Sequence, residues 1–352
     1  MLRIMLPLLC IAVMSACFAE GESPKPVSFT VSDTESLLAA VAKIPPLGET
    51  TINLLPGTYT IKDTIVIKQK SRVCLIGSGW NTKIVKQGDG DAIVFEGSCW
   101  MCWVRNMSIV GDPKATKGSG VVFRKGEWSG INVIDYCHID MFPESGVRFE
   151  GDVKTPFSSN TVSNCWLVNN LGDQLYSRAN NDFYITGNQF GRGPDRTPRS
   201  GCLLDHSSAG TYTMNYHWGN TVALRLGPGA HFNRIENNRL EQSYESGIVI
   251  GDPKGGDVNQ LNIITGNTIH TNSEHNSGKF PAVIAYDAVD TTFCQNQIFS
   301  WASDSVKHTI GLVLDKGCRD WIVKDNIFRH HSEKAVKYDK KAGHVVNDNI
   351  GT

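Results

Sequence analysis

Acidic and basic side chains collect in the middle of the chain, next to short apolar segments. Asp205 follows one segment, Arg225 lies in the next, and Glu241 and Glu245 lie in the turn before a third. Hydrolysis of a glycosidic bond needs two carboxyl groups, about 5 Å apart for retention of configuration or about 6.5 to 9.5 Å apart for inversion. We therefore predict a catalytic pair of Asp205 with one of the two glutamates, one as general acid and the other as base or nucleophile. Arg225 would bind the sugar between them.

Elimination at a uronic sugar is the second chemistry that these residues allow. It needs a base, for which Arg225 or Arg178 is available, beside a group that neutralises the carboxylate of the sugar. Tyr216, His217 or His206 would assist the proton transfer. The residues leave hydrolysis and elimination open, and each of them would be an ordinary solvated side chain in a protein that performs neither.

Polar loops on both sides of this region favour an acidic or sulfated glycan as the ligand. The loop that starts at Gly191 carries Arg192, Arg196 and Arg199, and the nearby Tyr216 and Trp218 offer rings that stack on sugars. The predicted substrate-binding residues are His206, Tyr216, His217, Trp218, Tyr244, Arg178 and Arg196.

No metal or other cofactor is assigned from the sequence. Asp252 and Asp257 lie in a glycine-rich loop and could ligate Ca²⁺, but such a loop is more often a plain turn, so calcium is only an alternative. Cys99 and Cys102 have CxxC spacing without a second such pair or matching histidines. This favours a local disulfide or packed thiols over zinc.

A repeat must position all of these side chains. A short apolar strand ends in an asparagine, or in Met or Cys at the same place, and a hydrophobic residue follows two positions later. This slot recurs at intervals of 23 to 30 residues, at Met107, Cys137, Cys165, Asn188, Asn215, Asn238, Asn267, Asn296, Asn326 and Asn349. A second phrase of alternating apolar residues, as in 92–96 and 246–250, lies between successive slots. Two short strands per unit cannot bury a face alone, so the units must stack.

Stacked units whose strands lie about 4.8 Å apart form a parallel β-solenoid, in which like positions make columns. One inward column would contain Phe95, Phe123, Phe149, Tyr176 and Leu204. The asparagines would lie in a bend, where each side-chain amide bonds to the next coil and satisfies polar groups that no strand reaches.

The repeat region resembles the right-handed parallel β-helix proteins of the pectate lyase superfamily, including its tailspike-like members. The resemblance covers residues 32–350 and includes the opening ESLLAAVAKIPPLGETTINLLPGTYTI followed by VCLIGSGWNTKIV. It implies an all-β fold, a single-stranded right-handed parallel β-helix of about ten or more coils with a short N-terminal capping helix. The motifs of pectin methylesterases, polygalacturonases and the related epimerases are missing, so the resemblance implies no particular reaction.

These features predict a secreted carbohydrate-active enzyme that cleaves glycosidic bonds of an acidic polysaccharide, as a hydrolase or a lyase. The alternative is a non-catalytic, glycan-binding or adhesin-like β-helix at the cell surface. A formal net charge of -1 gives no basic footprint for nucleic acid. The last coil would expose a sheet edge, which leaves contact within an oligomer open.

The first nineteen residues are predicted to be a signal peptide, since Arg3 precedes an apolar run that is too short for a permanent membrane span. Cys17 ends a segment that resembles a bacterial lipobox and would carry a lipid anchor, whereas cleavage after Ala19 is the alternative. We expect a secreted, periplasmic or cell-surface location.

Residues 20–50 are predicted to be a leader and a capping helix, and residues 51–352 the β-helix domain. Ser32 or Asp33 would cap the helix, with Leu37 and Leu38 among its buried residues, before Pro45 stops it.

Overall fold

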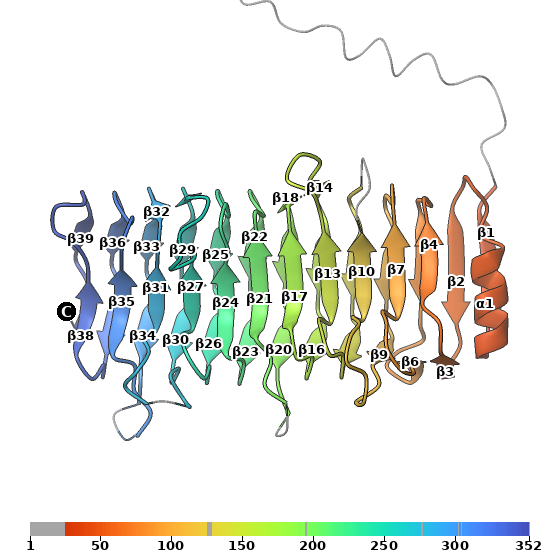
Figure 1. Cartoon of the computed structure of the whole chain (residues 1–352), viewed down its shortest axis with the longest axis horizontal. Coiled ribbons are helices and arrows are strands. Elements are labelled where there is room, and N and C mark those ends of the chain that lie inside the picture. Colours follow the sequence, from red (N-terminus) through yellow and green to blue (C-terminus); the bar gives the residue numbers. More distant parts are fainter. Residues whose placement is uncertain are drawn as a thin grey trace, which may run out of the picture.

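The computed structural model of the protein describes residues 25–124, 129–193, 196–275, 277–301, 303 and 305–351. The chain forms a single-stranded right-handed parallel β-helix, as predicted, with coils stacked along one long axis (Figure 1). Helix α1 (Thr34–Ala42) covers the N-terminal end of the stack. Within the described ranges, no helix is both long and apolar enough to cross a membrane. The predicted signal peptide and Cys17 lie outside these ranges.

Three long parallel sheets, named A, B and C in the order in which a coil passes through them, form the walls. Sheet A contains β1 (Val27–Val31), β2 (Thr50–Leu54), β5 (Val73–Ile76), β8 (Trp103–Arg105), β11 (Val133–Asp135), β15 (Thr161–Ser163), β19 (Tyr184–Thr186), β22 (Thr211–Thr213), β25 (Arg234–Glu236), β29 (Ile263–Thr265), β33 (Thr292–Cys294), β36 (Ile322–Lys324) and β39 (Val345–Asn347). Sheet B contains β3 (Gly57–Ile61), β6 (Thr82–Lys86), β9 (Ser108–Val110), β12 (His138–Asp140), β16 (Trp166–Val168), β20 (Gln189–Gly191), β23 (Tyr216–Trp218), β26 (Arg239–Glu241), β30 (Thr268–His270), β34 (Gln297–Phe299) and β37 (Ile327–Arg329).

Sheet C completes each coil before the chain returns to sheet A. It contains β4 (Ile65–Lys68), β7 (Ile93–Glu96), β10 (Val121–Arg124), β13 (Val147–Glu150), β17 (Asp173–Arg178), β21 (Ser200–Asp205), β24 (Val222–Leu226), β27 (Ile248–Ile250), β31 (Val283–Ala285), β35 (Ile310–Leu314) and β38 (Lys334–Lys337). Short pairs at the corner between C and A are β14 (Phe157–Ser158) with β18 (Asn180–Asn181), and β28 (Asn259–Gln260) with β32 (Ala288–Val289).

The asparagine slot forms a ladder at the corner between sheets A and B, as predicted. Asn215 donates from its backbone N to Oδ1 of Asn238 at 2.9 Å, and from Nδ2 to the same oxygen at 3.1 Å. Asn238 makes the same pair of bonds to Asn267, each at 2.9 Å. Cys165 takes the slot in its coil and donates from its backbone N to Asn188. The ladder therefore satisfies polar groups at a bend where the backbone leaves one sheet for the next.

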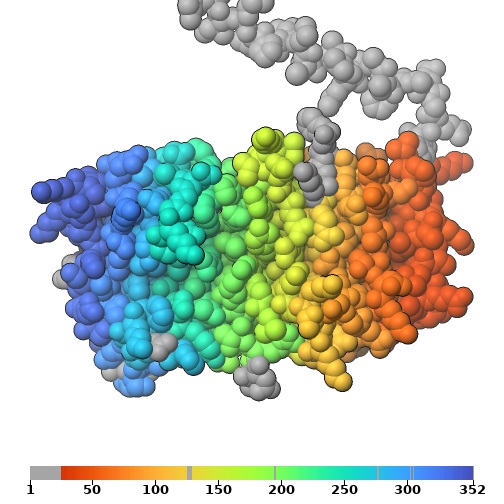
Figure 2. All heavy atoms as spheres, in the orientation of Figure 1, coloured from red at the N-terminus to blue at the C-terminus, as the bar shows by residue number. Residues whose placement is uncertain are grey.

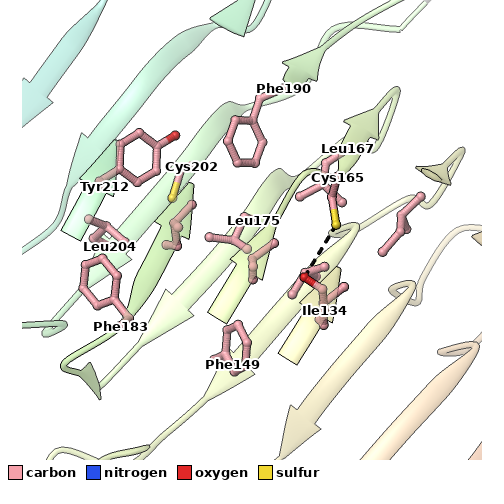
Figure 3. Packing of buried hydrophobic residues seen from close by; sticks show 14 of the residues in the cluster. Ile134, Phe149, Cys165, Leu167, Leu175, Phe183, Phe190, Cys202, Leu204 and Tyr212 are labelled. Carbon is pink, nitrogen blue, oxygen red and sulfur yellow. Dashed lines mark hydrogen bonds between the residues drawn. The ribbon is translucent and has the colours of Figure 1, made fainter. Parts of the chain in front are cut away.

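Apolar residues from all three sheets fill the interior. The rings of Phe95 and Phe123 stack with centroids 4.6 Å apart, and those of Phe123 and Phe149 lie 5.3 Å apart. The next position in this column is Ser177, and not Tyr176 as the sequence suggested, because Phe149 pairs with Ser177. Tyr176 instead pairs with Arg148 on the outer face. Figure 3 shows Phe149 and neighbouring core residues projecting into the space between the sheets.

Helix α1 begins at the N-cap residue Asp33, which accepts a hydrogen bond from the backbone N of Ser36. Leu37 and Ala40 are buried against the first coils, whereas Leu38 is exposed, so the buried face is narrower than predicted. β1, which precedes the helix, pairs in parallel with β2, which follows it. This pairing ties the leader to the first coil.

The described cysteines are free thiols. Cys99 and Cys102 are buried, as are Cys137 and Cys165 in the ladder column. At the CxxC spacing the structure therefore has packed thiols and no local disulfide.

Long loops leave the β-helix where the chain passes from sheet B to sheet C. They project at the lower edge in Figure 1, for example residues 111–120 between β9 and β10 and residues 271–275 after β30. Figure 2 shows the first of these as a gold protrusion. These loops form walls beside the outer face of sheet B.

Buried histidines predict acid sensitivity. Burial lowers the pKa of His308 to about 3, and its Nε2 accepts a hydrogen bond from the backbone N of Asn272 at 3.0 Å. An unfolded histidine takes up a proton near pH 6.5, whereas the folded one stays neutral down to about pH 3, so its stabilising contribution is lost as pH falls between these values. The loss is on the order of 3 kcal/mol at about pH 4.

Urea unfolding followed by circular dichroism at several pH values would measure this effect. His308→Asn supplies the acceptor used elsewhere in such corners. It should reduce the number of protons taken up on unfolding by about one, so the unfolding free energy should fall less steeply with falling pH. The matched control is the exposed His330→Asn, which should leave the slope unchanged. Equal slopes for both variants would contradict the assignment.

Candidate functional site

The outer face of sheet B brings titratable and aromatic residues from successive coils into two columns. One column holds, in register, Gln189, Tyr216, Arg239 and Thr268. The neighbouring column holds Trp218, Glu241, His270 and Phe299. The residue between these two positions in each strand faces the core, because side chains alternate along a strand.

Glu241 is the centre of a hydrogen-bonded cluster and is only 5% exposed. Its Oε1 accepts a hydrogen bond from the hydroxyl of Tyr216. Its Oε2 accepts one from Nε of Arg239 at 2.7 Å and lies 2.7 Å from Nε2 of His270. The guanidinium of Arg239 also lies over the ring of Tyr216, 5.1 Å from the centroid. Three coils thus contribute to one carboxylate.

The cluster fixes the protonation of its members. Burial alone would raise the pKa of Glu241, but hydrogen bonds from His270, Tyr216 and Arg239 outweigh burial and lower the pKa to about 2. Burial, together with the bond to Glu241, raises the pKa of Tyr216 to about 12. At neutral pH the centre therefore holds an ionised glutamate and a protonated phenol.

A cavity of about 350 Å³ opens directly on this cluster, lined among others by Arg239, Glu241, His270, Thr271 and Trp301. His270 stacks on Phe299 with ring centroids 5.1 Å apart and planes 7° apart, and Trp301 packs edge-on against both rings. Nδ1 of His270 lies 3.1 Å from Oγ1 of Thr271. The stacked ring and the ionised glutamate together hold the imidazole in one orientation.

A second cavity of about 230 Å³ shares the lining residue Gln242 with the first, and we call the two cavities together the groove. Arg192 and Trp218 line this second part. The guanidinium of Arg192 lies 4.7 Å from the ring centroid of Tyr244, which in turn stacks on His275 at 5.0 Å. Of the predicted residues, Tyr216 and Trp218 lie side by side with ring centroids 5.1 Å apart, and Tyr244 lies against Arg192 of the second cavity.

Asp205 lies elsewhere, at the end of β21 in sheet C. Its Oδ2 accepts a hydrogen bond from the hydroxyl of Tyr176 at 3.4 Å and lies 3.9 Å from Nε of Arg178. Asp205 closes an in-register column of alternating charge on the outer face, formed by Lys68, Glu96, Arg124, Glu150, Arg178 and Asp205. This column accounts for Asp205 and Arg178 as partners that stabilise stacked coils.

The structure does not bring Asp205 and Glu241 together as the predicted pair. Glu241 ends a strand of sheet B, at the edge where sheet C begins, whereas Asp205 ends a strand of sheet C, at the edge next to sheet A. A five-residue strand such as β24 spans about 13 Å, which exceeds the separation that either glycosidase geometry needs. The two carboxylates lie two coils apart and on different sheets of the β-helix.

Arg225 and Glu245 do not contact Glu241. Arg225 faces outward on β24, as predicted, but lies in the middle of sheet C between Leu203 and Val249 of the adjacent coils. Glu245 lies in the turn between β26 and β27, where its backbone N donates to the carbonyl of Thr221 at 2.9 Å. Neither residue lines the two cavities of the groove.

His217 cannot contact a substrate, contrary to the prediction, because it points into the core. It is fully buried, stacks on Phe190 with centroids 4.6 Å apart, and shares a hydrogen bond with the hydroxyl of Tyr212. Burial lowers its pKa to about 3, so the ring is neutral. Arg196 lies in the loop after β20, with Nη1 3.7 Å from Sδ of Met141, at the side of sheet B.

His206 is held between two carboxylates rather than at the groove. Its Nδ1 lies 2.6 Å from Oδ1 of Asp205, and its Nε2 lies 3.0 Å from Oδ2 of Asp257. Oδ1 of Asp252 accepts a hydrogen bond from the backbone N of Lys254, the geometry of a plain turn. Over the part of the chain that the structure describes, His, Cys, Asp and Glu form no group of three or more that could hold a metal ion.

Sequence reasoning missed Arg239, His270 and Trp301. A signal for two of them was present. His270 stands three residues after an asparagine of the ladder, as do Glu241 and Trp218, and Arg239 stands one residue after such an asparagine, as does Tyr216. Residues at the same offset from the slot must share a column on sheet B. Trp301 follows the end of β34 and carries no such signal.

Several solved structures share this fold. The mannuronan C-5 epimerase AlgE6 A-module of Azotobacter vinelandii matches with a TM-score of 0.61 and 14% identity, over 91% of this chain and 94% of that one. The tailspike protein of E. coli bacteriophage HK620, in complex with a pentasaccharide, matches with a TM-score of 0.67 and 13% identity, over 90% and 61%. A DFA-IIIase mutant from Arthrobacter chlorophenolicus A6, in complex with DFA-III, matches with a TM-score of 0.61 and 11% identity, over 90% and 87%. At these identities the likeness concerns the fold.

The fold and the groove define a right-handed parallel β-helix protein with a polar and aromatic site on one sheet. Residues 128–349 match the family model described as periplasmic copper-binding protein (NosD). The chain belongs to the NosD family. A search of curated proteins gives no match.

Proposed function

We propose that the protein acts on an acidic polysaccharide, and that the groove on sheet B breaks glycosidic bonds by elimination beside a uronate carboxylate. The observation that carries this proposal is the cluster of Tyr216, Arg239 and His270 around the ionised Glu241 on the wall of the groove. The proteins with the same fold add support for the ligand class, since they include a mannuronan epimerase, a tailspike in complex with a pentasaccharide and an enzyme in complex with DFA-III.

Elimination suits the cluster better than hydrolysis does. A glycosidase needs a protonated carboxyl group to donate to the leaving oxygen and a second carboxylate nearby. Glu241, with a pKa of about 2 and hydrogen bonds to both oxygens, is a poor general acid. Asp205, its predicted partner, lies across sheet C. The carboxylate is better suited to orient other groups than to donate a proton.

The remaining residues match the steps of elimination. Arg239 has a side chain that is 57% exposed and lines the cavity, so its outer N–H groups can bind the uronate carboxylate. Glu241 accepts from Nε2 of His270, which leaves Nδ1 as the nitrogen that takes the proton from C5 of the sugar. The C4–O bond then breaks, a C4–C5 double bond forms, and the leaving oxygen takes a proton from water. The hydroxide left from this water takes the proton that His270 removed from C5, which regenerates the base.

The family description names copper, but the described residues do not fit a copper centre. Copper sites in proteins use imidazole, thiolate and thioether ligands brought close together. Both ring nitrogens of His206 contact carboxylates, Nε2 of His270 contacts Glu241, and His, Cys, Asp and Glu form no group of three or more in the ranges that the structure covers. No step of the proposed reaction passes through copper.

The proposal includes export of the protein from the cytoplasm. The family is described as periplasmic, and residues 1–19 have the pattern of a signal peptide, so we propose that the protein meets its polysaccharide in the periplasm or outside the cell. Attachment through Cys17 and contact between copies at the last coil remain parts of the same proposal.

A panel of soluble polyuronates, sulfated polysaccharides and neutral polysaccharides tests the reaction. On a polyuronate, ultraviolet absorbance from unsaturated ends should rise in parallel with reducing ends. Reducing ends without absorbance would indicate hydrolysis. Exchange of the C5 proton in deuterated water without cleavage would indicate epimerisation, and retention of glycan without any reaction would favour the glycan-binding alternative.

A further inference from the structure

An exposed aromatic cluster lies on sheet B, towards the N-terminal end from the groove. Trp80 and His138 stack with ring centroids 5.2 Å apart, and Trp166 packs edge-on against Trp80 at 5.5 Å. The two tryptophans are 42% and 39% exposed. Large aromatic side chains gathered on a surface mark a binding site more often than single exposed ones do.

The turn that carries Trp80 is fixed to the neighbouring coils. The indole N–H of Trp80 donates to the carbonyl of Tyr136 at 3.1 Å, and its own carbonyl accepts from the hydroxyl of Ser108 at 3.0 Å. A Cβ on Gly77 would lie 2.3 Å from the carbonyl oxygen of Asn106, so only glycine permits this close approach. The rings are therefore held in place before any ligand arrives.

The aromatic cluster and the groove share one column of sheet B. Reading along the helix axis, the in-register residues are His138, Trp166, Gln189, Tyr216 and Arg239. Coils are about 4.8 Å apart, so Trp166 stands about 10 Å from Tyr216 and about 14 Å from the coil of Glu241. In between, the ring of Trp218 lies over Gly191, where an added Cβ would come within 2.0 Å of it. The surface between the two sites is thus partly aromatic.

Positively charged side chains lie near the aromatic cluster. Lys83 is exposed and stands two coils before His138 in the same column. Arg196 lies against Met141, beside the strand of His138. Burial lowers the pKa of His138, so its ring adds an uncharged surface below Trp80. Apolar rings flanked by positive side chains match a sugar chain that has apolar ring faces and carboxylates at its edges.

We propose that Trp80, His138 and Trp166 form a distal subsite that stacks on sugar rings of the same acidic polysaccharide whose reacting residue lies at Glu241, so that the chain runs along the β-helix axis. This inference rests on the proposed function for the identity of the ligand. It predicts tighter binding of long chains than of short ones, because only long chains reach both sites.

Affinity electrophoresis in gels containing polymannuronate, polygalacturonate, dextran sulfate or dextran tests the proposal on the full chain. In a gel with a polyuronate that slows the wild-type protein, Trp80→Ala and Trp166→Ala should weaken this retention about 3- to 10-fold. Trp166→Phe should restore most of the retention. Trp103→Ala is the matched control, since Trp103 is 37% exposed but lies on sheet A. Thermal unfolding of each variant separates lost stacking from lost folding.

The outcomes separate the two proposals. If the tryptophan variants of sheet B are retained like the wild type, the distal subsite is overturned while the reaction at Glu241 stands. If they lose retention but no polysaccharide is cleaved, the subsite stands and the proposed reaction fails. Absence of retention by every polysaccharide would overturn the subsite as well.

Discussion

Glu241→Gln should lower the rate of polysaccharide cleavage at least about 100-fold, while the protein stays folded. The substitution keeps the shape of the side chain but removes the negative charge that orients His270 and balances Arg239. General acid and base catalysis by a positioned side chain contributes about 10² to 10⁴-fold to a rate. His270→Ala should therefore cost as much as Glu241→Gln, and the double variant little more, because the two residues act as one unit.

The chain offers a close control for this experiment. Arg234 and Glu236 form the same arginine–glutamate pair on β25 in sheet A, with Nε and Oε1 2.8 Å apart, as Arg239 and Glu241 do on β26. Glu236→Gln removes the same charge from a more exposed pair of the same kind and should leave the rate unchanged. Initial rates over a range of substrate concentrations would show whether Glu241→Gln acts on kcat, as a catalytic role requires, rather than on KM alone.

Asp205→Asn distinguishes the site predicted from the sequence from the site on sheet B. We expect this variant to retain cleavage and to lose some stability, because it breaks contacts with Arg178 and Tyr176 in the charge column of sheet C. Loss of cleavage in Asp205→Asn with full activity in Glu241→Gln would reverse the assignment of the centre.

The fold was predictable because its unit is short and local. From Asn188 to Asn349 each coil repeats an asparagine at the same bend, and the bond from Asn215 to Asn238 follows directly from stacking like on like. The error at Tyr176 has a local cause. An aromatic residue seemed to continue the column of Phe149, but Ser177 takes that inward position, and the tyrosine hydroxyl reaches Asp205 outside.

The site was only half predictable, because the sequence did not show which sheet each polar residue occupied. Asp205 and Glu241 each end a strand, so they looked equivalent. They follow different phrases of the repeat, however, and each phrase builds a different sheet. His270 lies at the same offset from its asparagine as Glu241, but its contact with that glutamate depends on the ring rotation that Phe299 imposes. That contact comes from packing across coils.

The asparagine ladder should dominate stability, and Asn238→Ala is its sharpest test. Oδ1 of Asn238 accepts two hydrogen bonds from Asn215, and its Nδ2 donates to the carbonyl of Tyr212 at 3.0 Å and to Asn267. The alanine variant loses these four hydrogen bonds in a buried bend and leaves the backbone N of Asn215 without its acceptor. A hydrogen bond contributes about 0.5 to 1.5 kcal/mol and a buried unsatisfied group costs about 1 to 3 kcal/mol, so the expected loss of unfolding free energy is about 3 kcal/mol or more.

Asn349→Ala is the matched control at the end of the ladder, where the asparagine is partly exposed and serves the single neighbouring asparagine Asn326. Water can replace its bonds, so this variant should lose about 1 kcal/mol. Because each coil contacts only its neighbours, Asn238→Ala should also open the stack locally. Urea unfolding followed by circular dichroism gives the two free energies, and limited proteolysis should cut Asn238→Ala first within the coils beside Asn238. Equal stability and equal cleavage patterns would mean that the backbone ladders alone hold the coils together.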